Sequence, residues 1–235
     1  MQRILILNPK GGSGKTTVAT NLAANCAASG SRPALMDLDP QASSMRWLSK
    51  RPKDRAAVFG IAGYERSSAV TRSWQLRVPQ DCDPLIIDTP AAIETQGLPE
   101  ITRGADVILV PVMPSDIDIH AAAKCIADLL LVAKIKRSDD RIGIIANRVR
   151  ARTLVSQSLM KFLESLDIPL VATFRDSQNY VRAAEAGMGI FEMPSWRVRE
   201  DIGEWDALIA WLQNKQMKVG YAATGSGDRD SVLTD

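Results

Sequence analysis

The chain has 235 residues, of which 46% are hydrophobic and 24% charged, and its net charge is +2. This length suits one well-filled α/β domain and is short for two, so we expect a single domain over residues 1–219. Residues 220–235, rich in Gly, Ser, Thr and Asp, are expected to form a disordered tail. An apolar run starts close to the first residue and leaves no room for a secretory leader, and no apolar stretch is long enough to cross a bilayer. We therefore expect a cytoplasmic protein.

Short apolar runs alternate along the chain with longer segments of helical periodicity. The apolar runs predict strands at residues 4–7, 34–37, 85–88, 107–110, 142–146 and 170–173. The segments between them predict helices at residues 15–29, 95–103, 117–133, 153–166, 179–186 and 199–217. Residues 50–80 show neither period clearly, and we expect a short strand and a helix there. This alternation is typical of a mostly parallel sheet with helices on both faces, so the predicted fold is a doubly wound α/β domain.

A glycine-rich turn follows the first predicted strand and leads into a helix. It consists of Lys10, Gly11, Gly12, Ser13, Gly14, Lys15, Thr16 and Thr17. A turn of this kind directs several backbone N–H groups and the positive end of the helix at one point, which suits a phosphate. Lys15 is expected to reach the β- and γ-phosphates of ATP, and the Thr16 hydroxyl to ligate Mg²⁺. A merely flexible turn would not need Lys15 and the two threonines.

The turn departs from the usual phosphate-binding motif at its start. Pro9 stands where that motif has glycine, and Lys10 follows it. From this position Lys10 would have difficulty in curling back onto the γ-phosphate of its own nucleotide. We expect it to reach across a dimer interface and to stabilise transition-state charge there, as an arginine finger supplied in trans does.

Aspartates close the next two buried strands. Asp37 ends the second strand, Asp39 follows it, and Asp88 ends the third. In doubly wound folds the carboxyl ends of the strands face the ligand crevice, so we expect these carboxylates to lie at the nucleotide. The alternative is that they cap helices, which is credible for one of them but not for the set.

These motifs resemble those of the ParA/MinD family of deviant Walker A P-loop ATPases. The turn matches the family pattern K-G-G-x-G-K-T-[ST], residues 37–41 match D-x-D-P-Q, and residues 85–90 resemble the Walker B strand. The resemblance covers about residues 3–212. It implies a P-loop NTPase fold and a homodimer when ATP is bound.

The resemblance also implies roles for individual residues. Lys10, Lys15 and Asp39 would be the catalytic residues, with Asp39 positioning or activating the attacking water. Asp88 would hold the magnesium ion together with Thr16, and we expect the carboxylate of Asp37 to lie close behind them.

Two later segments are candidates for the adenine site. Asn147 and Arg148 end a predicted strand and resemble the position where the family reads adenine, although an Asn that closes a strand is as often a turn former. Both interpretations stay open. The segment from Phe174 to Asp176 occupies the place where the family's backbone lines the base.

Basic residues suggest a polyanionic partner. Between residues 134 and 161, eight Lys or Arg stand against two Asp. The candidates for binding DNA phosphates are Arg148, Arg150, Arg152, Lys161, Arg175 and Arg182. An ordinary basic surface is the alternative explanation.

The leading hypothesis is a ParA-type positioning ATPase. Such a protein binds DNA without sequence preference as an ATP-bound dimer and is nucleoid-associated. It segregates or positions a plasmid, chromosome or protein organelle through an adaptor protein that stimulates ATP hydrolysis. The rival is a MinD-like membrane-associated regulator. The apolar stripe formed by Trp205, Leu208, Ile209 and Leu212 could serve such a role, but core packing explains it better, and no membrane partner is expected.

Overall fold

The computed structural model describes residues 1–65, 76–91, 93–150 and 153–224. Its described strands form one parallel sheet in the order β3-β2-β4-β1-β5-β6-β7. The strands are β1 (Arg3–Ile6), β2 (Ala34–Asp37), β3 (Phe59–Ala62), β4 (Leu85–Asp88), β5 (Val107–Val112), β6 (Ile142–Val149) and β7 (Leu170–Arg175). The predicted doubly wound α/β fold is therefore confirmed. The strand order reverses at β1, and the loop that leaves β1 opens into the crevice where such folds bind ligands.

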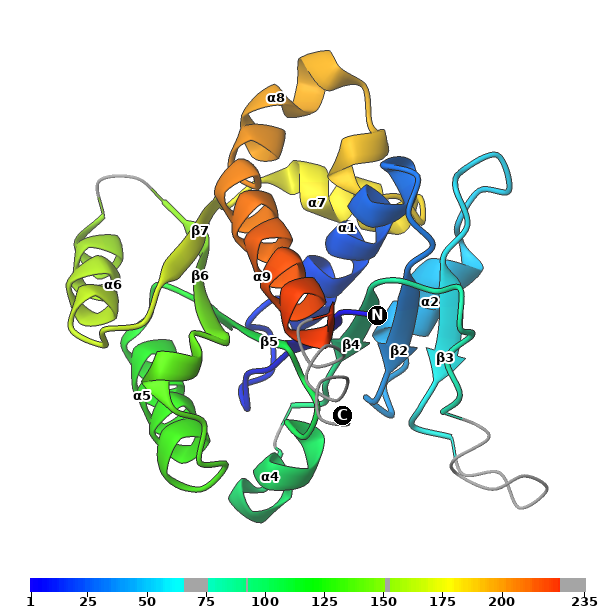
Figure 1. The fold of residues 1–235 in the computed structure, drawn as a ribbon. Coiled ribbons are helices and arrows are strands. Elements are labelled where there is room, and N and C mark those ends of the chain that lie inside the picture. Colours follow the sequence, from blue (N-terminus) through cyan, green and yellow to red (C-terminus); the bar gives the residue numbers. More distant parts are fainter. Residues whose placement is uncertain (66–75, 92, 151–152, 225–235) are drawn as a thin grey trace, which may run out of the picture.

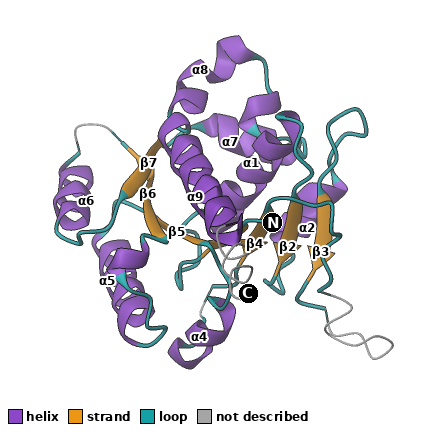
Figure 2. Cartoon of the chain, in the orientation of Figure 1, coloured by secondary structure: helices purple, strands orange, loops and turns teal. Residues whose placement is uncertain are grey.

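Helices cover both faces of the sheet (Figures 1 and 2). One face carries α1 (Lys15–Ala28), α2 (Ser43–Ser49), α7 (Gln178–Glu185), α8 (Ser195–Gly203) and α9 (Asp206–Thr224). The other face carries α4 (Leu98–Ile101), α5 (Asp116–Leu131) and α6 (Leu154–Glu164). Short 3₁₀ turns are η1 (Thr95–Gly97), η2 (Arg137–Asp139) and η3 (Ile190–Glu192).

The central strand, β1, shows why the predicted strands are apolar on both faces. Ile4 and Ile6 belong to the core under α1, whereas Leu5 and Leu7 belong to the core under α5. Side chains alternate between the two faces of a strand, so a strand covered on both faces buries every residue. The six predicted strands are present, and β3 is the short strand expected between residues 50 and 80. The helix expected beside it falls largely on residues outside the described ranges.

The structure differs from the predicted elements at three places. The seven-residue α2 was not predicted, because so short a helix shows no clear period. The single helix expected at residues 199–217 is two helices, which separate before Trp205. The tail was expected to begin at residue 220, but α9 continues to Thr224. The residues beyond Thr224 lie outside the described ranges, and the one-domain assignment stays a prediction.

Trp205 lies at the break between α8 and α9. Its side chain is fully buried and stacks on Phe174, with ring centroids 4.4 Å apart. Its indole N–H also donates to the Tyr180 hydroxyl at 3.0 Å. The buried indole thus adds a large apolar surface to the core and leaves its N–H paired. Within the described residues, no helix has the length and apolarity that a bilayer crossing requires.

A buried ion pair fastens η3 to the segment after α2. The Arg51 guanidinium donates to both oxygens of Glu192, at 2.6 and 2.9 Å. Both side chains are 5% exposed or less. The indole N–H of Trp47, on α2, donates to the Met188 carbonyl at 3.1 Å. These contacts hold α2 against the C-terminal part of the chain.

Candidate nucleotide site

The glycine-rich turn leads from β1 into α1, as the sequence predicts. Gly14 is the residue before the helix and has φ 96°, and Gly12 has φ 81°, so both lie in the left-handed region that favours glycine. No side chain caps the first N–H groups of α1. These donors, together with the positive end of the helix, suit an anionic ligand.

Asn147, near the end of β6, forms a hydrogen bond to the backbone of this turn. Its Nδ2 donates to the Ser13 carbonyl at 2.8 Å, and its Oδ1 accepts from the backbone N–H of Arg148 at 3.0 Å. A Cβ atom on Gly14 would lie 2.0 Å from Asn147 Nδ2, so a larger residue there would collide with this amide. Asn147 thus contacts the backbone of the turn. Its role in reading adenine stays a prediction.

Lys15 lies inside the turn. Its side chain is buried, and its Nζ donates to the Lys10 carbonyl at 3.2 Å. Burial lowers the pKa of Lys15, and the nearby carboxylates of Asp88 and Asp39 oppose that shift. A terminal phosphate would add negative charge next to the ammonium and would favour its protonated form.

Lys10 points away from the turn. Its Nζ donates to Asp118 Oδ2 at 2.7 Å, and the Asp118 side chain is 2% exposed whereas that of Lys10 is 31% exposed. Asp118 lies in the first turn of α5 and also accepts a hydrogen bond from the Ser115 hydroxyl. The sequence analysis did not identify Asp118, because nothing local marks it as the partner of a lysine 108 positions earlier.

Asp88, at the end of β4, meets the first turn of α1. The Thr16 hydroxyl donates to Asp88 Oδ2 at 2.8 Å. Burial raises the pKa of Asp88 to about 6, and hydroxyl hydrogen bonds from Ser44 and Thr16 oppose that shift. Its other oxygen, Oδ1, is buried and has no hydrogen-bond partner among the described residues. An unpartnered carboxylate oxygen beside a threonine hydroxyl is a donor set that fits Mg²⁺ or a water bound to it.

Asp37 is the register partner of Asp88 on the neighbouring strand. Its Oδ2 accepts from the backbone N–H groups of Ser44 and Met45 at 2.9 and 3.1 Å, and its Oδ1 accepts from that of Asp39 at 3.0 Å. Asp37 therefore caps α2, whose preceding residue provides no side-chain cap. Burial raises the pKa of Asp37 and the three amide donors oppose that shift. A role for it at the metal stays a prediction.

Asp39 lies in the partly exposed loop between β2 and α2. Its Oδ1 accepts from the backbone N–H of Gln41 at 2.9 Å, which shapes the loop. The negative charge of Asp39 acts to raise the pKa of Lys15, so the two groups interact electrostatically. The role of Asp39 at an attacking water stays a prediction.

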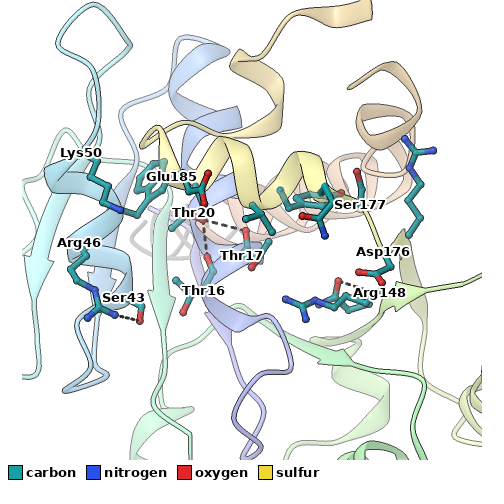
Figure 3. A pocket seen from close by; sticks show the side chains of 17 residues that line it. Thr16, Thr17, Thr20, Ser43, Arg46, Lys50, Arg148, Asp176, Ser177 and Glu185 are labelled. Carbon is teal, nitrogen blue, oxygen red and sulfur yellow. Dashed lines mark hydrogen bonds between the residues drawn. The ribbon is translucent and has the colours of Figure 1, made fainter. Parts of the chain in front are cut away.

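A cavity of about 440 Å³ opens beside the turn (Figure 3). Thr16 and Thr17 lie in the middle of its lining, Arg148 and Asp176 lie on one side, and Arg46 of α2 and Lys50, which follows that helix, lie on the other. The two predicted base-binding segments thus meet at one cavity with the phosphate turn. The α2 side of this cavity was not predicted, because no motif marks Arg46 or Lys50.

Phe174 does not contribute its side chain to this cavity. The ring is 2% exposed and packs against Trp205 in the core. A base could meet this segment through its backbone or through Asp176, which lines the cavity.

The candidate DNA-binding residues lie on several elements of the chain, and their role stays a prediction. Lys161 lies on α6 and Arg182 on α7, and these helices cover opposite faces of the sheet (Figure 1). Arg175 is bound to the fully buried Asp201, with Nε 2.7 Å from Oδ1. Arg150 is 2.6 Å from Asp176 in an exposed ion pair. Arg152 lies outside the described residues.

The sequence of this chain is similar to those of known nucleotide-binding and carboxysome-distribution proteins. The sequence model for the CobQ/CobB/MinD/ParA nucleotide binding domain matches residues 4–190. A maintenance of carboxysome distribution protein A from Gloeobacter kilaueensis is 29% identical over 199 residues, covering 84% of this chain and 87% of the relative. The protein of that name from Halothiobacillus neapolitanus is 26% identical over 191 residues, covering 81% of this chain and 87% of the relative.

Solved structures share the architecture. A Cyanothece McdA variant in complex with ATP superimposes on this chain with a TM-score of 0.66 and 18% identity. The superposition covers 88% of this chain and 96% of that protein. At this identity the likeness shows the fold alone.

Proposed function

This chain belongs to the CobQ/CobB/MinD/ParA nucleotide-binding family, and we propose that it is a Mg²⁺-dependent ATPase of the ParA type. It forms a sandwich dimer when ATP is bound, binds nucleoid DNA without sequence preference, and positions a cargo. A cargo-bound adaptor protein stimulates hydrolysis and releases the dimer. The relatives named for carboxysome distribution support a protein organelle as the cargo.

The observation that carries the proposal is the convergence of three groups at the start of α1. Lys15 is buried within the glycine-rich turn, and the Thr16 hydroxyl lies 2.8 Å from a carboxylate oxygen of Asp88. Lys15 would bind the terminal phosphates, and Thr16 with Asp88 would hold the cation. Bound Mg²⁺ would neutralise the charge that develops on the phosphate oxygens.

Two further residues would complete the chemistry. Asp39 would orient the attacking water, and its partly exposed loop between β2 and α2 supports this role. Lys10 would serve the nucleotide of a second subunit. Its ion pair with Asp118, 2.7 Å long, supports this, because Lys10 contributes no ammonium group to its own turn.

Light scattering on a sizing column tests the ATP-dependent dimer. We expect the Asp39→Ala variant, which should bind ATP without hydrolysing it, to elute as a dimer with MgATP and as a monomer without nucleotide.

Lys10→Ala should bind ATP as a monomer with unchanged affinity but lose adaptor-stimulated turnover. Full stimulated turnover in Lys10→Ala would remove the role in trans.

Charge reversal on the two faces tests DNA binding. Retention on random duplex DNA should require ATP and fall steeply as salt rises, because released counterions drive such binding. Arg182→Glu on α7 and Lys161→Glu on α6 are matched reversals on opposite faces. A reversal at a phosphate contact should reduce the salt slope by about 1, whereas the other variant should bind as the wild type does. If neither variant changes retention, neither position contacts DNA.

A further inference from the structure

Ser44 lies between the two strand-end carboxylates of the site. It is the second residue of α2 and is fully buried. Its hydroxyl donates to Asp88 Oδ2 at 2.7 Å, and its backbone N–H donates to Asp37 Oδ2 at 2.9 Å. One residue therefore contacts both carboxylates. No motif in the sequence assigns it a function.

The hydrogen bonds at Asp88 fix the orientation of its carboxylate. Oδ2 accepts two hydroxyl donors, Thr16 from α1 and Ser44 from α2, at 2.8 and 2.7 Å. Oδ1 is buried without a hydrogen-bond partner among the described residues. Two donors on one oxygen restrict rotation of the carboxylate, so the other oxygen keeps one direction. A buried carboxylate oxygen without a donor is costly unless a cation or a water completes it.

The helix that carries Ser44 is itself held at several points. Asp37 caps its first turn, and the Trp47 indole N–H binds the Met188 carbonyl at 3.1 Å. Ser44 is thus a fixed donor rather than a mobile one. Thr16 differs, because its hydroxyl oxygen would also serve the cation.

We propose that Ser44 is a positioning residue for the cation of MgATP. Its hydroxyl holds Asp88 in the orientation that presents Oδ1 to the metal or to a metal-bound water. Its backbone N–H links that orientation to Asp37 and so to the loop that bears Asp39. The inference rests on the proposed ATPase function and adds to it a residue that acts through Asp88.

Calorimetric titration of the full chain with ATPγS, in Mg²⁺ and separately in EDTA, tests the inference. For the wild type we expect tighter binding with Mg²⁺. Ser44→Ala should lose about 10- to 100-fold of that gain, as is usual when a residue that orients a metal ligand is removed, and should keep its affinity in EDTA. Ser49→Ala, on the same helix, is the matched control. Its exposed hydroxyl donates to the Arg46 carbonyl at 2.8 Å, so its titrations should match those of the wild type.

The possible results are distinguishable. An undiminished Mg²⁺ gain in Ser44→Ala would refute the positioning role and leave the proposed function intact. Equal losses in Mg²⁺ and in EDTA would show that Ser44 only supports the fold, which also overturns the role. Absence of any Mg²⁺ gain in the wild type would contradict the proposed function itself. Ser44→Cys keeps a hydrogen-bond donor at this position, but the thiol is a weaker donor than the hydroxyl, so this variant should show a partial loss of the gain.

Discussion

The buried carboxyl of Asp88 should make the nucleotide-free protein less stable as pH rises. Burial raises the pKa of Asp88 from an ordinary 3.8 to about 6. Between these two pH values the folded state therefore binds more protons than the unfolded state, so the free energy of unfolding falls as pH rises through this window. A shift of about 2 units at 1.36 kcal/mol per unit amounts to about 3 kcal/mol, all of it lost above the folded pKa.

Asp88→Asn isolates this effect, because an amide oxygen can still accept from Thr16 and Ser44 but has no charge to bury. Urea unfolding in EDTA without nucleotide would be measured for both proteins from about pH 4 to about pH 7.5. The unpaired amide N–H₂ costs about 1–3 kcal/mol at every pH, so the informative quantity is the change in the difference between variant and wild type. Relative to the wild type, the free energy of unfolding of the variant should rise by about 2.5 kcal/mol across this range, because part of the ~3 kcal/mol is already lost at about pH 4.

The exposed residue Asp54 provides a control, because Asp54→Asn changes the same functional group outside the core. A difference for Asp88→Asn that changes no more with pH than that for Asp54→Asn would show that the Asp88 carboxyl is not destabilised by burial. Burial of Asp88 would then provide no electrostatic reason for a cation to bind there.

Three other changes test the contacts around the site. Asp118→Asn weakens the ion pair that holds Lys10. The ATP concentration at half-maximal dimerisation, measured by light scattering, should fall by up to about tenfold, or about 1.4 kcal/mol. An unchanged half-maximal concentration would contradict this. Gly14→Ala forces a Cβ into Asn147 and should abolish ATP binding in calorimetry, whereas Gly12→Ala, with open space around its Cβ, should lose less; equal losses would point to backbone strain alone. Glu192→Ala leaves a buried guanidinium unpaired and should lower the free energy of unfolding by about 3–5 kcal/mol in urea. A loss within about 0.5 kcal/mol, as for surface substitutions, would exclude that pair as a stabilising element.

The sequence predicts those parts of the site that local chemistry determines. The glycines, Lys15 and Thr16 lie in one short segment, and Asp88 ends an apolar run, so their meeting at the sheet edge follows from the fold class. The residues that orient this core were not predictable in the same way.

These orienting contacts join distant positions. Ser44 and Asp88 are 44 positions apart, whereas Asn147 and Ser13 are 134 apart. Neither Ser44 nor Asn147 stands in a pattern that specifies its partner. The unpredicted helix α2 has a related cause, since Asp37, before the loop, caps it through tertiary geometry rather than a local motif.

Two contacts at the site, the Ser44–Asp88 hydrogen bond and the Lys10–Asp118 ion pair, differ in how readily they can break. Ser44 and its bond to Asp88 are fully buried, so the bond has no competing water. The Lys10 ammonium is 31% exposed, so water can replace Asp118 as its partner. If a second subunit approaches, this ion pair is therefore the contact best suited to break.

Breaking that ion pair would leave Asp118 charged and almost fully buried. Such an uncompensated charge costs about 3–5 kcal/mol, which the hydrogen bond from Ser115 reduces. If Lys10 acts across a dimer, the phosphate that it meets must offset this cost. A γ-phosphate carries enough charge to do so, and a dimer without one would leave Lys10 on Asp118. The ion pair would therefore make dimerisation depend on ATP rather than on ADP.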